Sequence, residues 1–236
     1  MVECAVIIPS RDRPESIRQS VDSAHAALAN AKCAGIVIIV DDGDDFPVRQ
    51  TLANRSTSAL RIAVNPGPKG PSAARNHGAG QAQSELLFFL DDDDLMEEDY
   101  IKRILAQRRS GSCKTAWGFS KIRDSRAYHG LPTNATMLGP EVPLRQRLVG
   151  IGTGFWVERV VFQKLGGLDE NLRINEDTDF CLALASDGLM PWYDPEPGVK
   201  LDAARPIGTG GTDRPSITKS ALAAERAAAW QYILKK

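Results

Sequence analysis

Four consecutive carboxylates follow a strongly apolar stretch of the sequence. Residues 86–90 read LLFFL and run directly into Asp91, Asp92, Asp93 and Asp94, and none of the next six residues is basic. Negative charges this close repel one another, so we expect a group from outside the chain to supply positive charge. Carboxylate oxygens are ligands that suit Mg²⁺ or Mn²⁺, and such ions often complete their coordination with substrate phosphates. The pattern therefore favours a metal–phosphate site.

Two other apolar segments end in polar residues in the same way. Residues 5–8 and 36–40 read as buried strands, and the residues that follow them are Pro9, Ser10, Arg11, Asp41 and Asp42. Ligands of open α/β sheets bind outside the carboxyl ends of the strands, so these segments should meet at one edge. The alternative is an acidic run that only caps the next helix and stays in solvent. The second acidic pair favours the metal–phosphate interpretation. An EF-hand loop is excluded, because its turn glycine and terminal glutamate are missing.

Strands and helices alternate through the first half of the chain. Apolar runs predict strands at 5–8, 36–40, 60–64 and 86–90, and three-to-four residue spacing of apolar positions predicts helices at 14–29, 48–54, 72–81 and 97–107. Strands that are apolar throughout and separated by helices indicate a mostly parallel sheet with helices on both faces. The sequence therefore predicts an α/β fold.

The second half is less regular. We expect strands at 115–119 and 155–157, helices at 160–165, 176–186 and 218–234, and a loop over the Pro- and Gly-rich residues 191–215. Asn175 is expected to cap the helix that starts at Glu176. Without a repeat or a clear linker, the chain is expected to be a single domain over 1–236. Its parts are a regular half (1–110), an irregular half (111–215) and a C-terminal helix (216–236).

Composition excludes several classes of protein. The net charge of −1 argues against a general nucleic-acid surface. No apolar run approaches the roughly 20 residues of a membrane-spanning helix, and no basic segment precedes the apolar start, so we expect no signal peptide. The four cysteines are scattered without metal-type spacing, which is typical of reduced thiols in a cytoplasmic protein.

Several longer motifs occur in an order that is familiar. AVIIPSRDRPESIRQSVDSA and IVIIVDDGDD come first, GPSAARNHGAGQAQSELLFFLDDDDL follows, and GTGFWVERVVFQKLGGLDENLRINEDTDFCLAL completes the set. Over roughly residues 3–188 the chain resembles the family 2 glycosyltransferases of the GT-A fold. The DDDD run corresponds to the DXD metal motif of that family, and NED corresponds to its "ED" motif.

The resemblance implies an inverting enzyme that uses a nucleotide-sugar, most often of the UDP type. The acceptor would be a hydroxyl of a glycan or of a lipid-linked molecule, in polysaccharide biosynthesis. Residues 1–110 would bind the nucleotide and 111–215 the acceptor, with Mn²⁺ or Mg²⁺ as cofactor. The family setting also implies a cytoplasmic protein, with peripheral contact at the inner face of the membrane or a homo-oligomer as further expectations; packing of the last helix on the domain or on a second subunit is favoured over membrane contact.

The resemblance also assigns the residues of the nucleotide side. Asp91 and Asp93 would be the DXD aspartates that hold the metal, with Asp91 nearer the ribose and Asp94 of lesser importance. The other residues expected to contact the nucleotide are Pro9, Ser10, Arg11, Asp41, Asp42, Arg75 and Asp92. Among these, Asp42 or Asp41 would face the base, and Arg75 the base or the diphosphate.

On the acceptor side, Asp177 matches the catalytic base of the family. Glu176 would support it, and Asp179 would be structural. Many relatives carry a histidine beyond this helix, whereas this chain has none after His129 and has Arg205 at about that place. Arginine cannot ligate a metal but would neutralise the leaving diphosphate, so the third metal ligand stays open. The segment PSRDR also departs from the family pattern, which leaves the nucleotide contacts there open.

Two other functions compete with this interpretation. A nucleotidyltransferase would have a related nucleotide half, but a Gly-rich loop normally follows its first strand, and PSRDRPES contains no glycine. A catalytically silent nucleotide-sugar-binding module is the other alternative. The presence of both the DXD and the ED motif argues against it.

Overall fold

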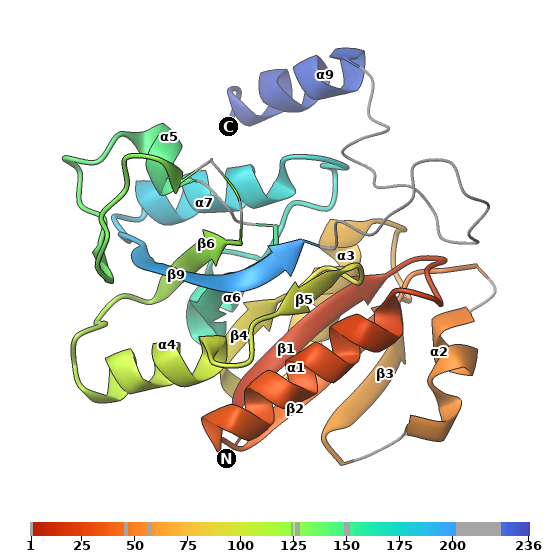
Figure 1. Ribbon diagram of the computed structural model, residues 1–236. Helices are drawn as coiled ribbons and strands as arrows, with labels where there is room; N and C mark the ends of the chain where they lie inside the picture. Colours follow the sequence, from red (N-terminus) through yellow and green to blue (C-terminus); the bar gives the residue numbers. More distant parts are fainter. Residues whose placement is uncertain are drawn as a thin grey trace.

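A single mixed sheet forms the centre of the protein (Figure 1). The computed structural model describes residues 2–44, 47–55, 58–123, 125, 128–148, 152–201 and 223–236. In these residues the sheet has nine strands: β1 (Val2–Ser10), β2 (Gly35–Asp41), β3 (Leu60–Val64), β4 (Ser84–Phe89), β5 (Asp94–Met96), β6 (Trp117–Ile122), β7 (Thr136–Met137), β8 (Phe155–Glu158) and β9 (Trp192–Leu201). Their order is β3-β2-β1-β4-β8-β6-β9-β5, and β7 pairs with β9.

The first half of the sheet is parallel, as predicted. β1 lies between β2 and β4, and β3 pairs with the outer side of β2, all in parallel register. Ile7 of β1 lies opposite Ile38 and Phe89, and Ser10 lies opposite Asp41. The carboxyl ends of these strands therefore share one edge, which brings the polar segments that follow them together.

The second half of the sheet mixes directions. β8 is antiparallel to both β4 and β6, and β9 is parallel to β6 but antiparallel to β5. The predicted loop at 191–215 is wrong over Trp192–Leu201, which form β9. Prolines lack the amide hydrogen of a sheet ladder, and here the ladder with β6 changes register beside Pro197, which accommodates them. The remainder of that segment, 202–215, lies outside the described residues.

The helices lie close to their predicted positions, except for the short α5, which was not predicted. They are α1 (Ile17–Ala31), α2 (Pro47–Thr51), α3 (Pro71–Gln81), α4 (Tyr100–Arg109), α5 (Leu144–Arg147), α6 (Arg159–Lys164), α7 (Glu176–Ser186) and α9 (Ala223–Ile233), with a 3₁₀ turn at Ala53–Arg55. The prediction for 176–186 is confirmed at both ends. α4 starts three residues after its predicted start, because the contact of this segment with β9 continues past β5 to Glu97, whose N–H donates to the Gly198 carbonyl at 2.9 Å.

Both faces of the sheet are covered, as predicted. Cys4, Val6 and Ile8 of β1 belong to an apolar core with residues of α1 and α4. The alternate residues Ala5 and Ile7 belong to a second core with residues of α3, α6 and α7. Figure 1 shows α1 and α3 on opposite sides of the strands. The central strands β1, β2 and β4 therefore bury both of their faces, which explains why their segments are apolar almost throughout.

A glycine sets how closely α3 approaches the sheet. A Cβ atom at Gly78 would lie 2.6 Å from Ile7 Cγ2 and 3.0 Å from Val40 Cγ2. Any side chain at this position would therefore push the helix away from β1 and β2. Arg75 stands three residues earlier on the same helix, so it shares the placement that Gly78 permits.

The C-terminal helix packs on the domain. Ala229 and Ile233 of α9 form a small apolar cluster with Leu172 and Ile174, which precede α7. Lys236 forms ion pairs with Asp169 and, at 2.9 Å, with Asp179. Figure 1 shows α9 on the same side of the molecule as α7. Among the residues that the structure describes, no helix combines the length and the apolar character needed to cross a bilayer.

Candidate active site

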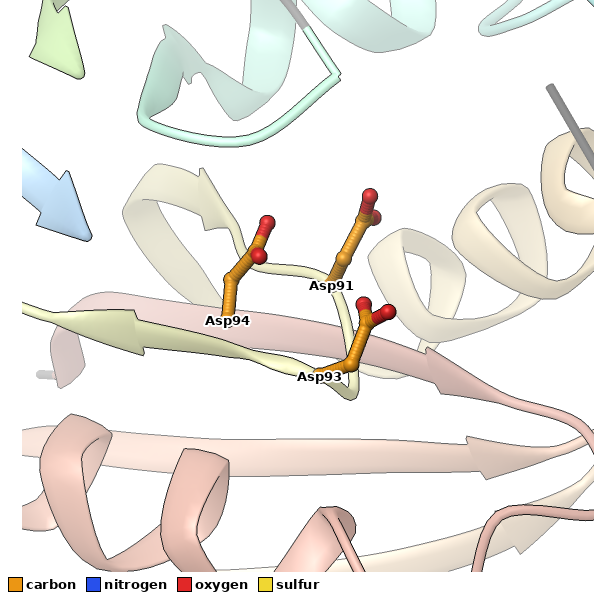
Figure 2. A group of neighbouring side chains, drawn as sticks. All are labelled: Asp91, Asp93 and Asp94. Atoms are coloured by element: carbon orange, nitrogen blue, oxygen red, sulfur yellow. The ribbon is translucent and has the colours of Figure 1, made fainter. Parts of the chain in front are cut away.

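The acidic run forms a tight turn directly after β4. The backbone N–H of Asp94 donates a hydrogen bond to the carbonyl of Asp91 at 3.2 Å. This turn brings oxygen atoms of Asp91, Asp93 and Asp94 within 4.8 Å of one another. In Figure 2 the three carboxylate ends point the same way from the turn. The turn thus presents three of the four carboxylates as a group.

Asp92 is directed elsewhere and is buried. Its carboxylate accepts hydrogen bonds from Ser10 Oγ and Arg13 Nη1, both at 2.6 Å. Arg13 also lies 3.2 Å from Asp93. Burial raises the pKa of Asp92, and the charge of Arg13 opposes that rise. Asp92 therefore joins the turn to the end of β1, and its predicted contact with a nucleotide stays a prediction.

The chain itself supplies part of the positive charge that the acidic run needs. Arg13 pairs with Asp92 and Asp93, and Arg75 pairs with Asp91. The role of Arg13 was not predicted, because this residue lies far from the acidic run in the sequence. The available signal was a basic residue directly after another strand of the same predicted edge, in PSRDR.

The donor set of the turn fits a hard divalent cation. Carboxylate oxygens from neighbouring positions are the usual protein ligands of Mg²⁺ and Mn²⁺. The sequence predicted Asp91 and Asp93 as ligands and left a third open, and the structure adds Asp94 to the group. The sequence predicted a lesser role for Asp94 in metal binding. The hydrogen bond that closes the turn and brings Asp94 toward Asp91 cannot be predicted from sequence.

Arg75 lies between the acidic turn and the start of α7. It is 6% exposed, and it donates from Nη2 to Asp91 Oδ1 at 2.6 Å and from Nη1 to Glu176 Oε1 at 2.7 Å. Asp91 and Glu176 are therefore brought to the two ends of one guanidinium group. The predicted contact of Arg75 with the base or diphosphate stays a prediction.

The start of α7 carries the second pair of carboxylates. Asn175 has a left-handed backbone (φ 61°) and no side-chain capping bond, so the expected cap is wrong in its mechanism. Burial raises the pKa of Glu176 to about 7, against the lowering effect of Arg75. Asp177 Oδ1 accepts a hydrogen bond from the N–H of Thr178 at 2.6 Å, in the first turn of the helix, where the helix dipole is favourable to an acidic side chain.

A small hollow lies between the end of β4 and the start of α7. Its lining combines an apolar floor with two charged groups, namely Phe89, Phe155, Leu168, Arg75, Asp177 and Gly152. A Cβ atom at Gly152 would lie 3.4 Å from Asp177 Oδ2, so the glycine leaves the space beside this carboxylate open. Asp177 and Arg75 therefore border the same small hollow.

The acidic pair at the end of β2 accepts hydrogen bonds from two segments, the loop before α3 and the segment that leads into α2. Asp42 accepts hydrogen bonds from Asn65 Nδ2 (2.6 Å) and the Gly70 N–H (2.9 Å), and burial raises its pKa. Asp41 accepts from the N–H groups of Gly43 and Arg49, each at 3.1 Å, and burial likewise raises its pKa. Their predicted contact with a nucleotide base stays a prediction.

The remaining residues that the sequence singled out are Pro9, Arg11, Asp179 and Arg205. Pro9 ends up on β1, and Arg11 follows it, with ion-pair distances of 3.9 Å to both Asp12 and Asp44. Asp179 pairs with Lys236, which fits the structural role expected for it. Arg205 lies outside the described residues, so the structure does not test its predicted position.

Comparisons with known proteins agree with this arrangement. The model of the family described as glycosyl transferase family 2 matches residues 5–166. The pre-mycofactocin glycosyltransferase of Mycobacterium tuberculosis is 23% identical over 201 residues, which are 82% of this chain and 41% of the relative. The succinoglycan biosynthesis protein ExoU of Rhizobium meliloti is 32% identical over 139 residues, 58% of this chain and 37% of the relative. The chain thus spans less than half the length of these relatives.

Solved structures support the fold. The structure of S. aureus TarS 1-349 in complex with UDP-GlcNAc is 17% identical, with a TM-score of 0.71, and the match covers 94% of this chain and 62% of that one. The α/β architecture is therefore that of a GT-A glycosyltransferase, as predicted. Because the family model matches well over half of the sequence, the chain belongs to glycosyl transferase family 2.

Proposed function

We propose that this chain is an inverting glycosyltransferase that transfers a sugar from a UDP-type nucleotide-sugar to a hydroxyl of a glycan or lipid-linked acceptor. One observation carries the proposal. Arg75 and Asp177 line the same hollow, and Arg75 also holds Asp91 of the acidic turn. A carboxylate that can accept a proton therefore stands near a group that can hold a metal and a diphosphate.

The donor side is assigned to the edge of the parallel strands. Pro9, Ser10 and Arg11 would line the nucleotide, Asp41 or Asp42 would face the base, and Arg75 with Arg205 would neutralise the leaving diphosphate. The UDP-GlcNAc complex of S. aureus TarS, which shares the fold, supports a UDP-type donor. The succinoglycan biosynthesis protein among the relatives supports a role in polysaccharide assembly.

A divalent cation is assigned to the acidic turn. Asp91 and Asp93 would hold Mn²⁺ or Mg²⁺, and the grouping supports Asp94 as a further ligand. When bound, such an ion neutralises charge on a diphosphate leaving group. Asp92 stays with Ser10 and Arg13, where it holds the turn against β1.

Asp177 is assigned as the general base. An inverting displacement requires a carboxylate that takes the proton of the acceptor hydroxyl as its oxygen attacks the anomeric carbon, opposite the leaving nucleotide. The N-terminus of α7 favours the ionised form of Asp177, and Gly152 leaves room beside it. Glu176, held by Arg75, would fix the position of this first helical turn.

The setting is assigned to the cytoplasm, with peripheral contact at the inner face of the membrane. Trp230 and Leu234 of the C-terminal segment are 44% and 80% exposed, next to the basic Lys235. Packing of these residues on the domain or on a second subunit, which would give a homo-oligomer, is favoured over contact with the membrane.

The test is the substitution Asp177→Asn. Because asparagine keeps the shape but cannot accept the proton, we expect turnover to fall about 10²-fold or more. Affinity for the nucleotide-sugar should change little, since Asp177 is assigned to the acceptor side. The measurements are release of nucleoside diphosphate with a panel of nucleotide-sugars, and the anomeric configuration of the product by NMR.

The control is Asp187→Asn at the other end of α7, where Asp187 pairs with Lys164 at 2.8 Å. This variant should keep full turnover. Near-normal turnover of Asp177→Asn would remove Asp177 as the base, and a product with retained configuration would contradict the inverting mechanism. Formation of a nucleotide-sugar from a sugar phosphate would instead support a nucleotidyltransferase.

A further inference from the structure

Arg75 spans two acidic elements that come from distant parts of the sequence. Asp91 belongs to the turn after β4, whereas Glu176 begins α7. The guanidinium group donates one hydrogen bond to each, at 2.6 Å and 2.7 Å. Its planar shape allows the two Nη atoms to serve two carboxylates at once. The position of α7 is therefore connected to that of the acidic turn through one side chain.

Burial makes this connection strong. Arg75 and Glu176 are 6% and 8% exposed, so water competes little for their hydrogen bonds. Because Gly78 lies close to β1 and β2, the distance of α3 from the sheet is set, and the backbone of Arg75 is held in place with the helix. A change in the hydrogen bond of Arg75 to Asp91 should therefore alter its hydrogen bond to Glu176, and the reverse.

The carboxylate of Asp91 can take part in two interactions that compete with each other. It pairs with Arg75, and it belongs to the group of three carboxylates that fits a divalent cation. A cation in that group would repel the guanidinium group. Arg75 would then loosen its hold on Asp91 and bind Glu176 more firmly, because Glu176 is its other anionic partner.

We propose that Arg75 is a positioning residue that couples occupation of the acidic turn by a divalent cation to the placement of α7, and hence of Asp177. The inference rests on the proposed function, since it takes Asp91 as a metal ligand. Its consequence is that the base is firmly held only when the donor side is loaded.

Binding of Mn²⁺ alone tests the coupling. We would measure free Mn²⁺ by electron paramagnetic resonance at pH 8, where Glu176 is ionised, for the wild type, Arg75→Met and Glu176→Gln. Arg75→Met should bind Mn²⁺ about threefold to tenfold more tightly, because a competing positive charge is gone. Glu176→Gln should bind about threefold more weakly, because Arg75 then has Asp91 as its remaining ionic partner.

Two sets of controls separate contact from general effects. Asp177→Asn removes a negative charge from the next residue, so it reports the effect of charge alone and should weaken Mn²⁺ binding less than Glu176→Gln does. Arg108 and Glu158 form a matched pair at 2.6 Å, and Glu158 lies opposite Leu86, away from the acidic turn. Arg108→Met and Glu158→Gln should leave Mn²⁺ affinity unchanged.

The outcomes are distinguishable. Unchanged or weaker binding in Arg75→Met would overturn the coupling, as would equal effects of Glu176→Gln and Asp177→Asn. If Arg75→Met fails to fold, the comparison of the latter two variants decides. Failure of the wild type to bind Mn²⁺ would instead overturn the metal assignment itself, and the coupling with it.

Discussion

At the scale of single residues, four identical side chains have different surroundings. Asp91, Asp93 and Asp94 face a common space, whereas Asp92 is buried against Ser10 and Arg13. The difference arises because the turn after β4 directs the side chain of Asp92 away from those of the other three aspartates. Residue type alone therefore does not define the role of each carboxylate.

This division predicts opposite outcomes for two neighbouring substitutions. Asp93→Ala should abolish Mn²⁺ binding, because its side chain belongs to the group of three carboxylates, and it should lower the free energy of unfolding by less than Asp92→Asn does, because its ion pair with Arg13 is longer and more exposed. Asp92→Asn should lower the free energy of unfolding by about 2 kcal/mol, because a buried charged hydrogen bond is lost, yet keep Mn²⁺ binding. Urea unfolding and Mn²⁺ titration measure the two effects. Loss of Mn²⁺ binding in Asp92→Asn alone would reverse the assignment.

Glu176 should make folding stability depend on pH. Burial raises its pKa from 4.5 to about 7, so the folded state holds this proton more tightly than the unfolded state. The stability contributed by the proton is present below pH 4.5 and is lost as pH rises through about 7. Between these limits the wild type should lose up to about 3 kcal/mol relative to Glu176→Gln.

The measurement is urea unfolding of both proteins from pH 4.5 to pH 8 in the presence of EDTA. Other buried carboxylates titrate in both proteins and cancel in the difference. Parallel stability curves would show that Glu176 keeps an ordinary pKa, and would contradict its burial against Arg75.

At the scale of elements, backbone contacts place the hollow. Gly154 has a left-handed backbone (φ 75°), its N–H donates to Phe89, and its carbonyl accepts from Tyr100 and Ser120. The segment before β8 is thereby attached to β4, β6 and α4. Gly152, two residues earlier, is held beside Asp177 as a result.

Gly154→Ala should therefore be costly. The left-handed backbone costs an alanine about 1 kcal/mol, and its Cβ would lie 3.2 Å from Ser120 Oγ and 3.3 Å from Val199 Cγ2. We expect about 2 kcal/mol in total, together with reduced turnover. Gly188 has the same backbone (φ 76°) with nothing within 4 Å of its Cβ position, so Gly188→Ala is the control. Equal losses of stability in the two variants would contradict the packing contribution.

At the scale of the whole molecule, the predictable part is the parallel half. There the strands are apolar runs and the helices are amphipathic, so residues such as Ile7 and Val21 carry a local signal of their burial. β9 had no such signal, since Pro195 and Pro197 read as loop and only pairing with β6 makes them strand. Antiparallel insertion of β8 between β4 and β6 likewise depends on contacts distant in sequence.

The candidate site likewise has a part that local sequence signals predict and a part that depends on contacts between distant residues. The acidic turn and the ED pair could be located from sequence, because strand order and motif resemblance place them. The bridge through Arg75, the diversion of Asp92 to Arg13 and the inclusion of Asp94 depend on side-chain directions in three dimensions. No pattern of residue types specifies those directions.

The close approach of Gly78 to the sheet has a consequence for how this protein tolerates change. The charged groups that meet at Arg75 are positioned from inside the protein, by a residue that carries no side chain and lies close to Ile7 and Val40. The region under functional selection should thus extend past the surface of the hollow into the apolar interior. At such a position, a glycine-to-alanine substitution would be inactivating although it adds only one methyl group.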